Sequence, residues 1–128
     1  MQLGAFSISL SVRDIKRSRA FYETLGFTPV GGDEAQNWLI LRNGHATIGL
    51  FTGMFEGNLL TFNPGWSPEA APLSDFDDVR EIEARLKTAG ISIISDAEAG
   101  DGPAHFVIED PDGNRILVDQ HVPRPSRR

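Results

Sequence analysis

The stretch FSISLSVRDIKRSRAFYETLGF, residues 6–27, decides the fold. In its first part large apolar residues alternate with serines, which is the period of a strand with one apolar face and one face of hydroxyl groups. Asp14 then offers a helix N-cap, and Gly26 is a residue of the type that ends helices. The stretch therefore predicts a strand followed directly by a helix that ends at Gly26.

The rest of the chain repeats this order. NWLILRN and ATIGLF flank an Asn43–Gly44 turn, which is a strong hairpin signal. Further on, LLTFNP is predicted as a strand and VREIEARLKTAG as a helix with the apolar stripe Val79, Ile82 and Leu86. ISIIS is predicted as extended, and HFVIE and RILVDQH form a second hairpin around the turn DPDGN. The two halves therefore match as an internal repeat.

The repeat predicts an α+β fold with two βαβββ modules in one chain, which pair into a partly open, concave, β-barrel-like sheet. We expect one domain over residues 1–128, with module one at about 5–56 and module two at about 58–122. The tail, residues 123–128, holds two prolines and three arginines and is expected to be a frayed, solvated end. The serines of the first strand are expected to face the cavity between the modules.

Composition excludes several classes of function. The formal charge of −6 argues against a nucleic-acid partner, which needs a basic face against phosphates. No apolar run is long enough to cross a membrane, and the first residues lack the order of a signal peptide, so we expect a cytoplasmic protein. The chain has no cysteine, so a metal ion would need oxygen or imidazole ligands. The imidazoles available are His45, His105 and His121.

With these motifs in view, the chain resembles the vicinal oxygen chelate superfamily, which includes glyoxalase I, extradiol dioxygenases, fosfomycin resistance enzymes and bleomycin resistance proteins. The resemblance covers residues 6–121. It is carried by Val12, Asp14, Ser18, Phe21, Tyr22, Leu25, Gly26 and Phe27 in the first module and by DPDGN, residues 110–114, in the second. It implies the duplicated fold, core positions for the motif aromatics Phe21 and Tyr22, and a homodimer. It does not imply one reaction, because activity depends on the side chains of the cavity.

Family enzymes hold one divalent metal with His, Gln or Glu side chains of the cavity. The resemblance places those ligand positions at Ser7, Gly49, Leu59 and Leu117. None of the four offers an imidazole or a carboxylate, and a serine hydroxyl is a poor ligand beside those groups. The sequence therefore predicts no cofactor and no metal at the usual positions, and it leaves open whether the chain catalyses a reaction.

A displaced metal site is the alternative. His105, Asp119 and His121 would be chemically adequate for zinc or iron, which would make the chain a metal-dependent lyase or dioxygenase of the glyoxalase type. His45 follows the Asn43–Gly44 turn and is expected to be an exposed turn residue. The acidic residues of 75–78 are predicted to cap a helix and not to bind calcium.

The preferred hypothesis is a metal-free protein that binds a small organic molecule in the cavity between its modules. An aromatic-lined concavity with few polar anchors is typical of such sites. The candidate binding residues are Ser7, Ser9, Trp38, Gly49, Phe51, Met54, Phe55, Asn58, Leu59, Leu117, Asp119 and His121. Trp66, Glu56 and Asn63 are further candidates in the same segments. A structural or regulatory protein with a vestigial cavity is a third hypothesis.

Overall fold

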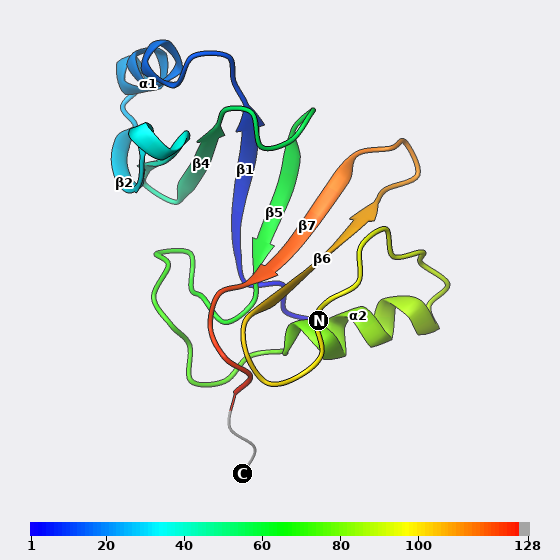
Figure 1. The fold of residues 1–128 in the computed structure, drawn as a ribbon. Helices are drawn as coiled ribbons and strands as arrows, with labels where there is room; N and C mark the ends of the chain where they lie inside the picture. Colours follow the sequence, from blue (N-terminus) through cyan, green and yellow to red (C-terminus); the bar gives the residue numbers. More distant parts are fainter. Residues whose placement is uncertain (126–128) are drawn as a thin grey trace. The chain divides into compact units, whose positions relative to one another are not determined.

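A computed structural model describes residues 1–125 and shows an α+β fold, which confirms the predicted class. The elements follow one another in the chain (Figure 1) as β1 (Ala5–Ser11), α1 (Ile15–Thr24), β2 (Thr28–Asp33), η1 (Glu34–Gln36), β3 (Trp38–Asn43), β4 (Ala46–Phe51), β5 (Leu59–Asn63), α2 (Val79–Thr88), β6 (Ala104–Glu109) and β7 (Arg115–Gln120). No helix in this described part is both long and apolar enough to cross a bilayer.

The chain divides into two compact units. We call Ser7–Leu59 the N-terminal unit, and Met1–Phe6 together with the described residues from Leu60 onward the C-terminal unit. Strand β1 therefore contributes its first two residues to one unit and the remainder to the other. The module bounds of about 5–56 and about 58–122 remain a prediction.

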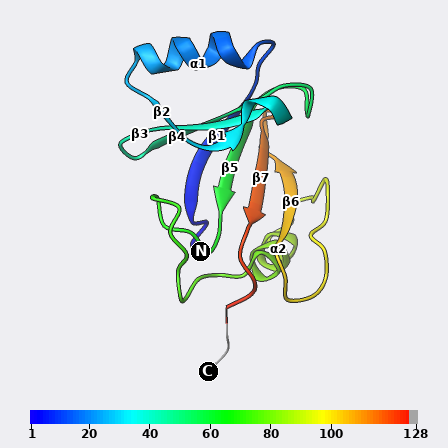
Figure 2. The ribbon, with the colours of Figure 1, turned by 60° about the vertical axis from the view of Figure 1, so that its left-hand side comes forward.

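The N-terminal unit is a βαβββ module with the strand order β2-β3-β4-β1. Strand β3 runs antiparallel to β2 and β4, and β1 runs parallel to β4. Helix α1 lies on one face of these strands (Figure 2), with its N-cap Asp14 accepting a hydrogen bond from the N–H of Arg17 at 3.3 Å. The core between helix and sheet consists of Ile15, Leu39, Leu41 and Leu50, with Leu10, Val12, Tyr22, Phe27 and Ile48 packed against it.

The C-terminal unit has the strand order β5-β7-β6, and α2 packs on one face of the β6–β7 hairpin. Its buried residues are Val79, Ile82, Ala104, Phe106, Ile108 and Val118. The turn DPDGN is held by Asp110, whose Oδ1 accepts from the N–H groups of Asp112 at 2.9 Å and Asn114 at 2.8 Å. These side-chain bonds fix the turn that the sequence predicted between the two strands.

Two predicted burial patterns are wrong in part. Phe21, expected in the core, is 63% exposed, because α1 turns Ile15 and Tyr22 toward the sheet instead. On the apolar face of β1, Leu10 packs on the α1 core, while Phe6 and Ile8 remain 44% and 37% exposed. The alternating pattern predicted the strand correctly, but it could not show how far the helix would cover it.

The segment ISIIS, residues 91–95, does not form a strand of its own and contributes only an isolated bridge between Ser95 and Val107. The C-terminal unit is therefore βαββ with a residual fourth extended segment. The prediction of a frayed tail does not hold at Arg124. The N–H of this residue donates to the carbonyl of Asp101 at 2.7 Å. Residues 126–128 of that tail lie outside the described part.

Candidate functional site

One face of the N-terminal unit gathers five of the twelve predicted binding residues. Side chains of a strand alternate between faces, and Ile8, Leu10, Ile48 and Leu50 face α1 or its core. Their neighbours therefore face away from α1, with Ser9 paired to Gly49, Gly49 to Ile40 and Phe51 to Trp38. We call this surface the aromatic face; it comprises Ser7, Ser9, Ser11, Trp38, Ile40, Gly49 and Phe51.

The loop 52–58 folds back onto this face. The hydroxyl of Ser11 donates to the carbonyl of Phe55 at 3.0 Å, and the N–H of Ser11 donates to Oδ1 of Asn58 at 3.3 Å. The rings of Phe51 and Phe55 pack at 5.3 Å between centroids, whereas Met54 at the loop tip is 54% exposed. Ser11 was not among the predicted site residues, although its place in the serine row was the signal that could have found it.

The position of Gly49 is a direct test of whether this face fits a metal ligand. Gly49 is buried, and a Cβ atom placed on it would lie 2.6 Å from Cε2 of Phe51 and 3.2 Å from Cδ1 of Ile40. Real Cβ atoms do not approach another carbon at the shorter of these distances, so the aromatic ring already takes the space that a longer side chain needs. A carboxylate at this position does not fit the structure as it stands.

The other three ligand positions offer no better donors. Ser7 and Leu59 belong to the N-terminal unit and Leu117 to the C-terminal unit, and all three are half-buried. One hydroxyl and two isobutyl groups do not form a donor set for a divalent cation. The residues at the usual positions therefore do not fit the metal ion that the resemblance implies.

The C-terminal unit brings together a second group of predicted residues. Leu117 and Asp119 alternate with Val118 and Gln120 and so face away from α2. Nε2 of His121 lies 3.1 Å from Oδ2 of Asp119, and the imidazole stacks on Trp66 with 4.5 Å between ring centroids and 8° between ring planes. The Asp119 carboxylate raises the pKa of His121 above its ordinary value, against the opposing effect of burial.

The stacking partner of His121 could not be found from the sequence, because Trp66 lies far from it along the chain and no motif links the two. Trp66 is itself held by the backbone, since its carbonyl accepts from the N–H of Ala5 at 3.1 Å. The backbone that carries the indole under His121 is therefore anchored to Ala5.

His105 does not complete this group as a metal site. Its Cα is paired with that of Asp119 across the β6–β7 ladder, and its side chain is exposed. Among residues 1–125, no group of three or more His, Asp or Glu side chains is placed to hold a metal ion. The displaced set of His105, Asp119 and His121 is therefore not assembled.

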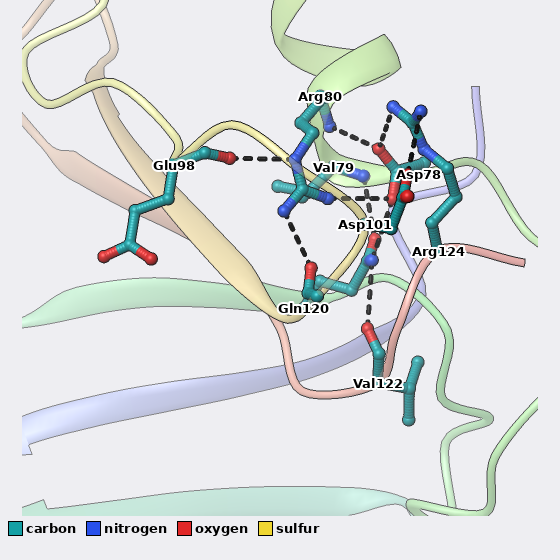
Figure 3. A network of polar contacts seen from close by, with 9 residues as sticks. Asp78, Val79, Arg80, Glu98, Asp101, Gln120, Val122 and Arg124 are labelled. Carbon is teal, nitrogen blue, oxygen red and sulfur yellow. Dashed lines mark hydrogen bonds and ion pairs between the residues drawn. The ribbon is translucent and has the colours of Figure 1, made fainter.

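Of the acidic residues predicted to cap α2, Asp78 is the N-cap, and it does more than cap the helix (Figure 3). The buried carboxylate of Asp78 accepts from the N–H of Arg80 at 3.1 Å, from Nε2 of Gln120 at 2.9 Å and from Nη2 of Arg124 at 3.2 Å. Gln120 in turn accepts the N–H of Val79 at 2.7 Å. Burial acts to raise the pKa of Asp78, but these donors outweigh it and hold that pKa below its ordinary value.

Arg80 and Arg124 extend the network into the neighbouring loop. Nε and Nη2 of Arg80 donate to the carbonyls of Glu98 and Gly102 at 2.8 and 2.7 Å, and Arg124 reaches Asp101 (Figure 3). Nε of Arg124 is buried without a hydrogen-bond partner, but the other guanidinium contacts join α2, the loop and the segment after β7. It is a structural network and not a candidate site.

Comparison with known proteins places this geometry in context. The family model described as Glyoxalase/Bleomycin resistance protein/Dioxygenase superfamily matches residues 4–118. A superfamily member from Vibrio splendidus 12B01 is similar at 18% identity, with a TM-score of 0.66 and coverage of 91% of this chain and 97% of that one. A structure from Legionella pneumophila, titled as an NAD-dependent benzaldehyde dehydrogenase, gives 23% identity, a TM-score of 0.68 and coverage of 91% and 98%.

A third similar structure is the Mn(II)-bound glyoxalase from Novosphingobium aromaticivorans, at 21% identity and a TM-score of 0.55. The match covers 97% of this chain but 40% of that protein. At these identities the likeness concerns the fold alone. Curated protein sequences returned no match.

Proposed function

Because the chain belongs to the Glyoxalase/Bleomycin resistance protein/Dioxygenase superfamily, we propose that it binds a small organic molecule without the help of a metal ion. The observation that carries this proposal is the Phe51 ring, which occupies the space beside Gly49 where a relative would present a carboxylate. The donor chemistry supports the same conclusion, since Ser7, Leu59 and Leu117 cannot replace imidazole or carboxylate.

The aromatic face favours a neutral, planar ligand. Trp38, Phe51 and Phe55 are each half-buried, so part of every ring is available for contact. Aromatic pairs contribute about 0.5–1.5 kcal/mol beyond the area that they bury. In this proposal Ser9, Asn58 and the exposed Met54 border the ligand. The cytoplasmic location expected from the sequence is part of the same proposal.

The test is a ligand screen on chelator-treated protein by thermal shift and native mass spectrometry. We expect neutral bicyclic aromatic compounds, such as naphthol and quinolinone derivatives, to raise the melting temperature by several degrees and to bind at one molecule per chain. Addition of EDTA is expected to leave their affinity unchanged, because no metal mediates the contact.

Two variants locate the site. Phe55→Ala and Trp38→Ala are expected to weaken the best compound at least tenfold, while Leu73→Ala, an exposed apolar residue of the C-terminal unit, serves as the matched control. A broad aromatic library that shifts the melting temperature of the wild type by less than one degree would contradict the proposal. Equal weakening by all three variants would contradict the placement on the aromatic face.

A further inference from the structure

The aromatic face of the N-terminal unit has a polar end, near the turn between β3 and β4. Arg42 lies four residues after Trp38 on β3, and residues at even spacing in a strand share a face. Thr47 is the partner of Arg42 on β4. Ser7 lies beside Thr47, because the parallel register of β1 and β4 begins with the next residue of each strand. We call Arg42, Thr47 and Ser7 the Arg42 row.

Arg42 carries a charge that the chain does not neutralise. The side chain is half-buried, and its Nε donates to Oγ1 of Thr47 at 3.3 Å. Within residues 1–125, Arg42 forms no ion pair, and its terminal nitrogens Nη1 and Nη2 have no hydrogen-bond partner and are not buried. A charge that is partly withdrawn from water is usually paired. The guanidinium is therefore held in place by one bond while four of its N–H groups stay available.

The hairpin of the C-terminal unit shows how such a charge is met within the chain. Arg115 on β7 lies opposite Glu109 on β6, and Nε of Arg115 is 3.3 Å from Oε1 of Glu109. A hairpin ladder thus has room for an acidic partner directly across from an arginine. The residue across from Arg42 is Thr47, which accepts a hydrogen bond but brings no negative charge.

The rings of the aromatic face come close to this row. Cε2 of Phe51 lies 2.6 Å from the place that a Cβ atom on Gly49 would take, so the ring extends from its own position back to that of Gly49. Gly49 and Thr47 are two residues apart on β4. Because a strand rises about 3.3 Å per residue, the ring and the row are separated by roughly 7 Å. A bicyclic ring system beside Phe51 can therefore extend a substituent to Arg42 along the same face.

We propose that the Arg42 row binds the carboxylate of an aromatic acid whose rings lie on the aromatic face. Nη1 and Nη2 of a guanidinium present parallel N–H groups that match the two oxygens of a planar carboxylate. The hydroxyl groups of Thr47 and Ser7 are further donors beside it. The inference rests on the proposed function and adds the class of ligand. The ring system is neutral where it meets Phe51, and one negative charge lies at its other end.

The test compares 2-naphthoic acid with 2-naphthamide, which has nearly the same shape but no charge. Isothermal titration calorimetry on the full, chelator-treated chain at neutral pH measures both affinities. The wild type is expected to bind the acid at least tenfold more tightly than the amide, as hydrogen bonds to charged groups usually give. Arg42→Gln is expected to abolish this preference and to leave the affinity for the amide within about twofold of the wild type.

Three further variants separate charge, geometry and general effects. Arg42→Lys keeps the charge but loses the paired N–H groups, so it should retain only part of the preference for the acid. Thr47→Val keeps the shape of the side chain, removes the bond that positions Arg42, and should reduce the preference severalfold. Arg17→Gln removes an exposed arginine of α1 that has no ion pair in the described residues, and it is the matched control with an unchanged preference.

The outcomes distinguish this inference from the proposed function. Equal affinity of the wild type for the acid and the amide would overturn the Arg42 row as a carboxylate site and leave the proposed function standing. A preference that survives in Arg42→Gln, or that Arg17→Gln removes to the same extent, would overturn it as well. Failure of both compounds to bind the wild type would contradict the proposed function, and this inference with it.

Discussion

Phe51 and Gly49 are next-but-one neighbours on β4, and Cε2 of the Phe51 ring lies 2.6 Å from the place that a Cβ atom on Gly49 would take. Residues two apart on a strand share a face, so a larger side chain at one position restricts the other. A larger residue at position 49 therefore needs the Phe51 ring to shift. The pair therefore presents an aromatic ring and no carboxylate at this point of the aromatic face.

The first prediction concerns the coupling of these two residues. Gly49→Ala is expected to lower the free energy of unfolding by about 1–3 kcal/mol, as overpacking usually does. In the Phe51→Leu background the same substitution should cost much less, because the Cε2 atom that the new methyl group would meet is gone. Chemical denaturation of the four proteins measures the coupling. A cost that is equal in both backgrounds would show that the ring moves away freely.

The second prediction concerns metal binding. Gly49→Glu is expected to lower stability and to leave the affinity for Mn²⁺ and Zn²⁺ as low as in the wild type, because one carboxylate beside Ser7 and leucines is not a donor set. Isothermal titration calorimetry with each cation measures this. Tight stoichiometric binding by the single variant would show that the remaining side chains can complete a site.

The third prediction concerns the ion pair of His121. Asp119 raises the pKa of His121 above about 6.5, so the pair stabilises the fold fully below that pH and its contribution is lost as the pH rises through the folded-state pKa. The effect is limited to about 1 kcal/mol, because both groups are partly exposed. Asp119→Asn should return the pKa of His121 toward its ordinary value. NMR titration of the proton on Cε1 of the imidazole measures the pKa of His121 in the wild type and in the variant.

Tryptophan fluorescence offers a control for that titration. In a Trp38→Phe background Trp66 is the one remaining tryptophan, and its emission should follow the protonation of the imidazole stacked on it. In the Trp66→Phe protein, which keeps Trp38, the same pH range should change the emission little. Identical pH profiles for the two variants would contradict the stacked geometry.

The fourth prediction concerns the buried network at the start of α2. Asp78→Ala leaves Gln120, Arg80 and Arg124 without their shared acceptor and is expected to cost about 3–5 kcal/mol of stability. Asp75→Ala changes an exposed carboxylate three residues earlier and should stay within about 0.5 kcal/mol of the wild type. Urea denaturation at neutral pH compares the two.

The stabilisation that Asp78 gives to this network also depends on pH. The pKa of Asp78 is depressed, so its contribution is present above the ordinary carboxyl pKa of about 4 and is lost as the pH falls through the folded-state value. The free energy of unfolding should therefore fall less steeply on acidification in Asp78→Asn than in the wild type. Equal acid sensitivity of the two proteins would contradict the assigned role of Asp78.

Short sequence patterns were sufficient to predict the helices, most of the strands and most of the turns. The serine and apolar alternation, the Asp14 cap and the Asn43–Gly44 turn act through neighbours in sequence, so each appears in the structure where it was predicted. The segment 91–95 did not follow its pattern, because a strand exists only when a partner pairs with it along its length. The position of Phe21 could not be predicted for a similar reason, since its exposure depends on which side of α1 packs on the sheet.

By itself, the sequence determined the α+β fold and predicted that the usual metal-ligand positions carry no imidazole or carboxylate, because periodicity, turn residues and side-chain chemistry are properties of short stretches. Only the tertiary structure decided that Phe51 fills the place beside Gly49, that His121 stacks on Trp66, and that Phe21 is exposed. Those facts depend on rotamers and on contacts between distant residues, and packing sets both once the chain has folded.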